Sequence, residues 1–351
     1  MSTSAHASRW FKSDNTAPAA PEVMAALAEA NRGYARGYGD DAWAARAERR
    51  FSEVFERDVR VFLVGTGTSA NALALATLVP PYGSVFCHEQ AHIVRDECGA
   101  PEFMTGGARL QLLPGDGAKL TPAALLRGIA DNPTAVHTVQ PRAVSISQAT
   151  ELGTVYRPAE LRALSDAAHA HGLLVHMDGA RFANAVASLG CTPAAASAAS
   201  GVDVLSFGAT KNGAFAAEAV VFFDPARAAD FEFRRKRAGH LFSKMRYVAA
   251  QWLAYLDDGL WLRLAARANA HARRIGEAAG SLRLQPVEAN EVFARPGAAG
   301  VATLRAQGFE FYDWGADGSG EARFVVSWDQ TDEDVDALCA ALRALPDAAA
   351  T

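Results

Sequence analysis

The sequence predicts an α/β protein with a large domain built on a mainly parallel sheet and a small C-terminal α+β domain. Three observations support this. The chain has 351 residues, more than one ordinary hydrophobic core needs. Its middle part alternates short β-branched runs with helical stretches, which is typical of a parallel sheet covered on both faces. After Asp224 this alternation stops. We expect an N-terminal segment (1–30), a large cofactor-binding domain (31–260) and a small domain (261–351).

The elements of the large domain follow in order. The expected strands are Val59–Val64, Ser84–Cys87, Ala143–Ser147, Leu173–Met177, Val202–Phe207 and Ala219–Phe223. The expected helices are Ala70–Val79, Thr121–Ala130, Pro158–His171 and Ala180–Leu189. Thr121 followed by Pro122 is a typical helix start, because threonine caps the first N–H groups and proline fits the first turn.

The small domain follows long helical stretches between about Pro225 and Gly280. Its expected strands are Glu291–Arg295, Phe309–Tyr312 and Arg323–Trp328, with helices Ala298–Gln307 and Asp332–Leu345. We expect the N-terminal segment to pack near this domain or near a neighbouring subunit.

Composition excludes several classes of function. The net charge is −5 and the charges are well mixed, so no basic field attracts nucleic acid or an anionic membrane. No apolar stretch approaches the roughly 20 residues that span a bilayer, and the N-terminus lacks a signal-peptide core. The four cysteines are scattered without a paired motif, which indicates reduced residues of a cytoplasmic protein.

A glycine-rich turn, residues 65–71 (Gly-Thr-Gly-Thr-Ser-Ala-Asn), links a predicted strand to a helix. Glycines let the backbone approach a ligand, and free N–H groups at a helix start suit a phosphate. The same residues also match the dinucleotide-binding motif Gly-x-Gly-x-x-Ala, and Glu89 follows at about the distance of the acidic residue of that motif. A dinucleotide site, and with it a nicotinamide-dependent dehydrogenase, is therefore an alternative. The hydroxyls of Thr68 and Ser69 favour a monophosphate.

His88-Glu89-Gln90-Ala91-His92 matches the His-Glu-x-x-His pattern of zinc enzymes. On a helix that spacing puts both histidines on one face. Here the segment follows a predicted strand and no third ligand is evident, so we expect no metal. The alternatives are a structural histidine or an imidazole that stacks on a flat cofactor.

Asp178 and Lys211 each stand at the end of a predicted strand, the edge where α/β sheets bind ligands. Asp178 could cap a helix, or its charge could keep a pyridinium nitrogen protonated. Arg181 follows three positions on. Lys211 lies among small residues, an unusual place for a solvated charge, and a desolvated lysine can form a Schiff base with an aldehyde. Neither a zinc nor a nicotinamide interpretation explains these two residues.

These motifs together resemble the L-threonine aldolases, members of the beta-eliminating lyase family within the fold-type I, aspartate-aminotransferase-like superfamily of pyridoxal-phosphate enzymes. The resemblance runs from Lys12 to the last helix. It is carried by five segments in order, which are 38–41 (Tyr-Gly-Asp-Asp), 65–71, 91–92 (Ala-His), 176–181 (His-Met-Asp-Gly-Ala-Arg) and 210–211 (Thr-Lys).

The resemblance implies a site for pyridoxal 5′-phosphate. Lys211 would form the Schiff base, Asp178 would bind the ring nitrogen and His92 would stack on the ring. The phosphate would be held by Gly67, Thr68, Ser69 and, from a neighbouring subunit, Lys236. Catalytic roles would fall to Lys211, His92 and Asp178.

The resemblance also implies a substrate site. Arg181 would lie by the cofactor's phenolic oxygen or the substrate carboxylate, which Ser13 and Arg323 would bind. Tyr38 would cross a subunit interface, and His137 is a weaker candidate than His92 for the base. The resemblance thus implies a homodimer or homotetramer whose subunits share active sites.

The sequence departs from the family in one chemical respect. Where many aldolases have Glu-Asn-Thr-His-Asn-Gly, this chain has Gln-Ala-Thr-Glu-Leu-Gly at 148–153, and Gln148 cannot titrate. Asn212 and Gly213 also replace the more common glycine-rich pair after Lys211. These differences resemble a subgroup that includes aldolases acting on aromatic substrates.

The expected reaction is retro-aldol cleavage of L-threonine, L-allo-threonine or a related, phenylserine-type L-β-hydroxy-α-amino acid to glycine and an aldehyde. Three alternatives are another fold-type I pyridoxal enzyme (a β-eliminating lyase or an aminotransferase), a non-catalytic pyridoxal-phosphate-binding protein and the dehydrogenase.

Overall fold

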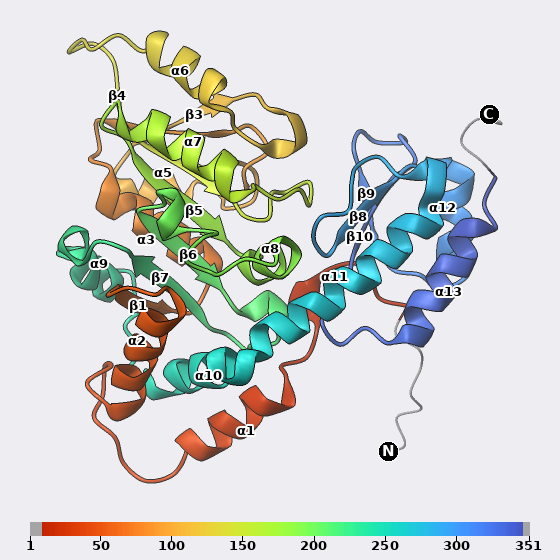
Figure 1. Ribbon diagram of the computed structural model, residues 1–351, viewed down its shortest axis with the longest axis horizontal. Coiled ribbons are helices and arrows are strands. Elements are labelled where there is room, and N and C mark those ends of the chain that lie inside the picture. The colour runs from red at the N-terminus through yellow and green to blue at the C-terminus, as the bar shows by residue number, and fades with distance from the viewer. Residues whose placement is uncertain (1–8, 347–351) are drawn as a thin grey trace.

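The large part of the molecule is built on a mainly parallel sheet (Figure 1). The computed structural model describes residues 9–346, and seven strands of this range form the sheet. In spatial order they are β1 (Arg60–Val64), β7 (Glu218–Phe222), β6 (Val204–Gly208), β5 (Leu174–Gly179), β4 (Gln140–Ser147), β2 (Gly83–His88) and β3 (Arg109–Leu113). The run from β6 to β3 is parallel, whereas β7 is antiparallel to β6 and β1. The predicted fold class is confirmed.

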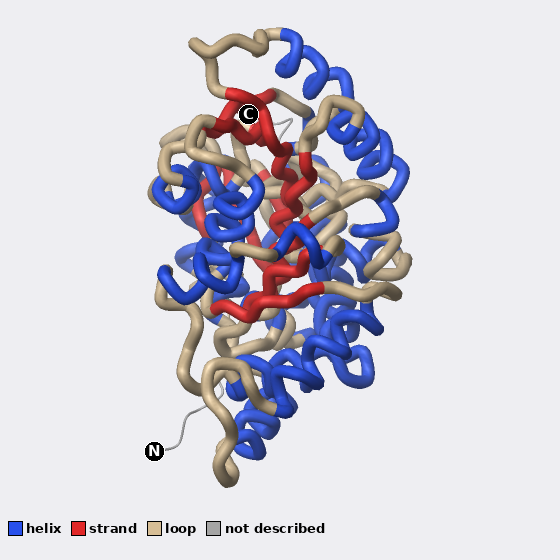
Figure 2. Tube along the Cα trace, turned by 90° about the vertical axis from the view of Figure 1, so that its left-hand side faces the viewer, coloured by secondary structure: helices blue, strands red, loops and turns tan. Residues whose placement is uncertain are grey.

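Helices cover both faces of this sheet (Figure 2). One face carries α3 (Gly67–Leu78), α4 (His92–Arg95), α5 (Ala100–Thr105) and α9 (Phe231–Arg237). The other carries α2 (Ala42–Val54), α6 (Pro122–Ala130), α7 (Pro158–His169), α8 (Phe182–Leu189) and α10 (Arg246–Leu256), with α1 (Pro21–Ala30) against α10. Strands buried on both faces explain the nearly continuous apolar runs in the sequence.

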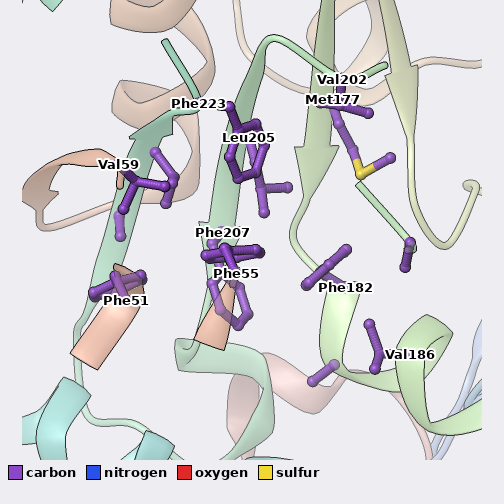
Figure 3. Close-up of a cluster of buried hydrophobic side chains, with 14 of the residues drawn as sticks. Phe51, Phe55, Val59, Met177, Phe182, Val186, Val202, Leu205, Phe207 and Phe223 are labelled. Carbon is purple, nitrogen blue, oxygen red and sulfur yellow. The ribbon is translucent and has the colours of Figure 1, made fainter. Parts of the chain in front are cut away.

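An aromatic core fixes the second face of the sheet (Figure 3). Phe207 of β6 meets Phe182 of α8 edge to face with ring centroids 5.2 Å apart, and Phe55 meets Phe223 at 5.1 Å. Each of these side chains is at most 2% exposed. Such contacts add to the hydrophobic energy of burial and hold β6, whose end carries the candidate lysine, in one position.

A second, smaller sheet lies beside the first part of the molecule (Figure 1). Its strands within the described residues are β8 (Glu291–Ala294), β10 (Glu321–Val325) and β9 (Tyr312–Trp314), paired antiparallel in that order. The helices around it are α11 (Leu260–Ala279), α12 (Gly297–Ala306) and α13 (Asp332–Arg343). The division at about residue 260 stays a prediction, since α11 contacts both α8 and β8. No helix within residues 9–346 is long and apolar enough to cross a membrane.

Residues 9–11 of the N-terminal segment pack on the small domain, one of the two positions expected for that segment. Phe11 is 0% exposed, its N–H donates to Glu310 O at 2.7 Å, and its carbonyl accepts from Val325 N–H at 2.8 Å. The following short 3-10 helix, Asp14–Thr16, contacts the segment that carries Lys211. This connection brings residues 14–16 to the candidate site.

The sequence prediction differs from the structure mainly in the small sheet. Phe309 and Phe311 were expected in a strand that ends at Tyr312, but they fill the core next to the N-terminal segment and β9 begins at Tyr312. The strand expected at Arg323–Trp328 is shifted towards the N-terminus, to Glu321–Val325. Strand β3 and helices α1, α2, α4 and α5 were not predicted. The long helical stretch contains three α-helices, α9 to α11, which glycines with positive φ separate at Gly239 and Gly259.

Candidate active site

A cavity of about 410 Å³ opens at the carboxyl ends of the parallel strands. Ser147 at the end of β4 pairs with Asp178 of β5, which pairs in turn with Ser206 of β6. The residues after these strands therefore meet at one edge, as the ligand sites of α/β sheets do. Six of the predicted site residues line the cavity, namely Gly67, Thr68, His92, Asp178, Arg181 and Lys211.

The glycine-rich turn leads into α3 on one side of the cavity. Thr66 caps the helix by accepting from Ser69 N–H at 3.2 Å, and the Ser69 hydroxyl donates to Thr66 O at 2.8 Å. A Cβ at Gly65 would meet the Phe242 ring at 2.9 Å, whereas one at Gly67 would meet nothing within 4 Å. The N–H groups of Gly67 and Thr68, two residues that line the cavity, lack intrahelical partners, which suits an anion. Ser69 is buried behind the turn.

Asp178 is held by two hydrogen bonds at the end of β5. Its Oδ2 accepts from Asn71 Nδ2 at 2.8 Å and its Oδ1 accepts from Ala180 N–H at 3.0 Å. The capping position of α8 belongs to Arg181, so the helix-cap alternative for Asp178 does not apply. Asn71 Oδ1 is buried and has no partner among the described residues. Asn71, which the sequence did not single out, therefore orients the carboxylate.

Lys211 lies in a short 3-10 helix, Thr210–Asn212, after β6. The next residue, Asn212, is buried and donates to Tyr255 Oη at 2.7 Å and to Trp261 O at 2.9 Å. Gly213 has a φ of +103°, a conformation that glycine adopts without strain. The departure from the family noted after the lysine therefore anchors the segment to the helical layer.

His92 is oriented by a carboxylate that the sequence analysis missed. His92 Nδ1 and Glu97 Oε1 are 2.9 Å apart, and Glu97 Oε1 also accepts from Asn71 Nδ2 at 2.8 Å. The hydrogen bond to Glu97 raises the pKa of His92 despite its burial, and burial raises the pKa of Glu97. His88 belongs to β2 and its Nε2 bonds to Gly115 O at 2.8 Å, so the two histidines do not share the helix face that the His-Glu-x-x-His pattern requires.

Arg181 is part of a buried ion cluster. Its guanidinium donates to both oxygens of Asp14 at 2.8 and 2.9 Å, and its Nη1 lies 3.5 Å from Glu291 Oε2. Arg323 Nη1 approaches the other oxygen of Glu291 at 3.8 Å. Burial opposes the charge of Arg181, but Asp14 and Glu291 outweigh it and raise its pKa. Burial also raises the pKa of Glu291, against the attraction of both arginines.

The remaining predicted residues lie outside the cavity lining. Ser13 caps the 3-10 helix whose Asn15 lines the cavity. Arg323 is linked to the cavity residue Arg181 through Glu291, which lies close to both guanidinium groups. Lys236 lies over the Tyr38 ring, 4.8 Å from its centroid, on the outer surface. His137 is exposed in a turn before β4, at the opposite end of that strand from the cavity. The structure does not bring His137 to the site, and we do not carry it into the proposed function.

Three further carboxylates line the cavity, namely Asp96, Glu151 and Glu218, and no role was predicted from the sequence for the two glutamates. Glu218 of β7 is 7% exposed, and burial raises its pKa to about 7. Glu151 follows β4, and burial raises its pKa to about 7 as well. Glu218 is the first residue of β7 and is flanked in sequence by apolar residues on both sides, which was the one sequence signal of a buried acid.

Comparison with known proteins gives concordant matches. The model of the beta-eliminating lyase family matches residues 11–296. A low specificity L-threonine aldolase of Pseudomonas aeruginosa is 50% identical over 95% of this chain and 96% of its own length. Another, from a Pseudomonas species, is 47% identical over 96% and 98%. The solved threonine aldolase structure from Leishmania major has a TM-score of 0.89 at 29% identity, over 95% of this chain and 98% of that one. The chain belongs to the beta-eliminating lyase family.

Proposed function

We propose that this protein is a carbon–carbon lyase that uses pyridoxal phosphate to cleave L-threonine, L-allo-threonine or related, including aromatic, L-β-hydroxy-α-amino acids to glycine and an aldehyde. The observation that carries the proposal is the meeting of Asp178, Lys211 and an anion-binding helix start in one cavity. The names of the two Pseudomonas relatives and of the Leishmania major structure support the same reaction.

The cavity residues fit pyridoxal phosphate. Gly67, Thr68 and Ser69 would hold the phosphate, Asp178 the ring nitrogen and Lys211 the aldehyde carbon, with His92 beside the ring. When bound, the cofactor supplies an electron-withdrawing ring that can absorb the electron pair of the broken Cα–Cβ bond. The open space beside Gly67 and the fixed carboxylate of Asp178 match two of these demands.

The chain's own residues would position the substrate. Ser13, Arg181 and Arg323 would bind its carboxylate, which fixes rotation about the Cα–N bond and sets the direction of Cα–Cβ. Asp14 holds Arg181 through two hydrogen bonds, so that the guanidinium is already in place when a substrate arrives. Glu97 fixes the plane of the His92 ring.

Product analysis tests the proposed reaction. Incubation of the purified protein and added pyridoxal phosphate with L-threonine is expected to release glycine and acetaldehyde in equal amounts. A β-eliminating lyase would release ammonia and a keto acid, and an aminotransferase would consume an added keto acid. L-2-aminobutyrate has no β-hydroxyl and serves as the control that gives neither glycine nor an aldehyde. Ammonia from threonine without glycine would contradict the proposal.

Replacement of Arg323 by alanine is expected to raise KM for L-threonine by about 10-fold or more, since a charge-assisted hydrogen bond contributes roughly 1.5–3 kcal/mol. The value of kcat should change by less than about threefold, because the interaction is made equally in ground and transition states. Steady-state kinetics measure both values. Arg305→Ala is the matched control, since Arg305 pairs with exposed Asp313 in the same small sheet region. An unchanged KM would show that the carboxylate is bound elsewhere.

We also propose that the protein is a cytoplasmic homodimer or homotetramer with active sites shared between subunits. Tyr38 is 55% exposed and stacks with Lys236, and Phe233 is 69% exposed on the same helix as Lys236. Exposed aromatic residues that gather near one another are typical of subunit interfaces.

The four cysteines are free, which agrees with a reducing compartment.

A further inference from the structure

The loop after β4 turns one polar side chain away from the cavity and another towards it. Gln148 is 0% exposed, donates to Tyr156 O at 2.9 Å and accepts from Tyr156 N–H at 3.0 Å. Both the nitrogen and the oxygen of its amide therefore help to hold the loop. Glu151, three positions on, lines the cavity with Asp178 and Lys211. Many aldolases have a glutamate where this chain has Gln148, and here Glu151 offers a carboxyl group that can take up and release a proton.

One oxygen of Glu151 is held and the other is not. Oε1 accepts from His92 N–H at 2.8 Å and from the Ser147 hydroxyl at 2.5 Å. Oε2 is buried and has no hydrogen-bond partner among the described residues. A buried carboxylate oxygen without a partner costs free energy, and a hydroxyl group of a bound ligand would satisfy it.

The other acids of the cavity are less suited to contact a substrate hydroxyl. Both oxygens of Asp178 already accept hydrogen bonds, and Glu218 is hydrogen-bonded by Thr210. Asp96 stands at the exposed end of α4, where it lacks the burial that raises the pKa of Glu151. The Glu97 side chain is 0% exposed, and its Oε1 is shared by His92 and Asn71. Glu151 lines the cavity and is held through Oε1 alone, so it combines a fixed position with one oxygen that is left for a ligand hydroxyl.

We propose that Glu151 accepts the hydrogen bond of the substrate's β-hydroxyl and takes its proton as the Cα–Cβ bond breaks. This inference rests on the proposed function and deepens it. The proton passes to Oε2, the O–H electron pair forms the carbonyl bond of the aldehyde, and the Cα–Cβ pair stays with Cα. Cα then gains a proton from water to give glycine, and Glu151 returns its own proton to water. His92, the base expected from the sequence, is left to orient the cofactor.

The surroundings of Glu151 suit a group that takes and returns a proton near neutral pH. Burial raises its pKa to about 7, against the hydrogen bonds from Ser147 and His92 N–H, and the charge of Asp178 adds to the rise. The other titratable groups on which its charge acts are the Cys87 thiol on β2 and the buried Tyr156 hydroxyl before α7, and burial together with Glu151 raises the pKa of each. A general base works best with a pKa near the working pH.

Glu151→Gln in the holoenzyme separates this role from others. Glutamine keeps the shape and the oxygen that accepts from His92 and Ser147, but it cannot take a proton. We expect kcat for L-threonine cleavage to fall about 100-fold or more. Exchange of the glycine α-hydrogen in D2O, followed by NMR, involves no β-hydroxyl and should stay within about threefold of wild type. Glu160→Gln, the same change at a residue that pairs with Lys119 outside the cavity, should alter neither rate.

A second measurement does not depend on turnover. Because folding raises the pKa of Glu151, its contribution to stability is full below the ordinary value of 4.5 and is lost as pH rises through about 7. The melting temperature of the Glu151→Gln holoenzyme minus that of the wild-type holoenzyme should therefore increase as the pH rises from 4.5 to about 7. The Glu160→Gln variant should show no such increase, because the pKa of Glu160 is lowered in the folded protein.

The outcomes distinguish the two proposals. If Glu151→Gln cleaves threonine at the wild-type rate, the proton goes elsewhere and the inference is overturned. Equal losses of cleavage and glycine exchange would also overturn it, because they would show that Glu151 holds the cofactor or the fold. A flat difference in melting temperature across the range would exclude Glu151 as a titrating group. If the wild-type protein neither cleaves threonine nor exchanges glycine, the proposed function itself fails.

Discussion

Replacement of Lys211 by alanine is expected to abolish the cleavage of L-threonine and to remove the visible absorbance that pyridoxal phosphate acquires when bonded to a lysine. The reason is chemical, since alanine has no amine to bond the aldehyde carbon. The loss of kcat should reach about 1,000-fold or more, the size usual for removal of a covalent catalyst. The measurements are steady-state kinetics and an absorbance spectrum of the purified protein.

The control for this substitution is Lys119→Ala. Lys119 pairs with Glu160 and lies outside the cavity, so the control removes a lysine without touching the site. It should keep both the spectrum and the rate. The fold of the Lys211→Ala variant should persist, because the neighbouring anchor is the Asn212 side chain and not the lysine itself. Retention of absorbance and turnover by Lys211→Ala would defeat the assignment of the lysine.

Asp178→Asn is expected to keep part of the bound cofactor but to lose most of the rate. A carboxylate about 4 Å from a pyridinium at an effective dielectric constant near 20 contributes roughly 4 kcal/mol before desolvation. Loss of that attraction corresponds to a fall in kcat of up to about 1,000-fold. Asparagine can still accept through one oxygen from Asn71 or from Ala180 N–H, so the strand end should hold its shape.

Kinetics and a cofactor titration measure the effect of Asp178→Asn. The matched control is Asp313→Asn, which makes the same change at an exposed residue that pairs with Arg305. It should leave kcat and cofactor affinity within about twofold of wild type. A near-normal kcat in Asp178→Asn would mean that the ring nitrogen needs no negative charge, and the role assigned to this carboxylate would be given up.

The parts of the site that follow strands could be predicted from the sequence because their signals are local. The glycine-rich turn, Asp178 and Lys211 each come directly after a buried apolar run. Parallel strands bring such ends to one edge without further information. The family to which the chain belongs was recognised from the same segments. The roles given to the individual residues stay predictions.

The acidic partners could not be predicted because their contacts join distant segments. Asp14 meets Arg181 from 167 positions away, and Asn290 meets Asp14 from 276 positions away. Nothing near these residues distinguishes them from the exposed acids of the chain. The strand shift in the small sheet has the same origin, since Phe309 and Phe311 pack near a segment that begins the chain.

The Arg181 cluster holds charges of both signs, and this affects how an amino acid can bind. Two guanidinium groups face two carboxylates, Asp14 and Glu291, and the charge of Lys211 also acts on both carboxylates. An arriving α-carboxylate adds a negative charge beside Glu291. Its charge pushes the already raised pKa of Glu291 further up. Ligand entry and proton uptake at Glu291 are then thermodynamically coupled, and each favours the other.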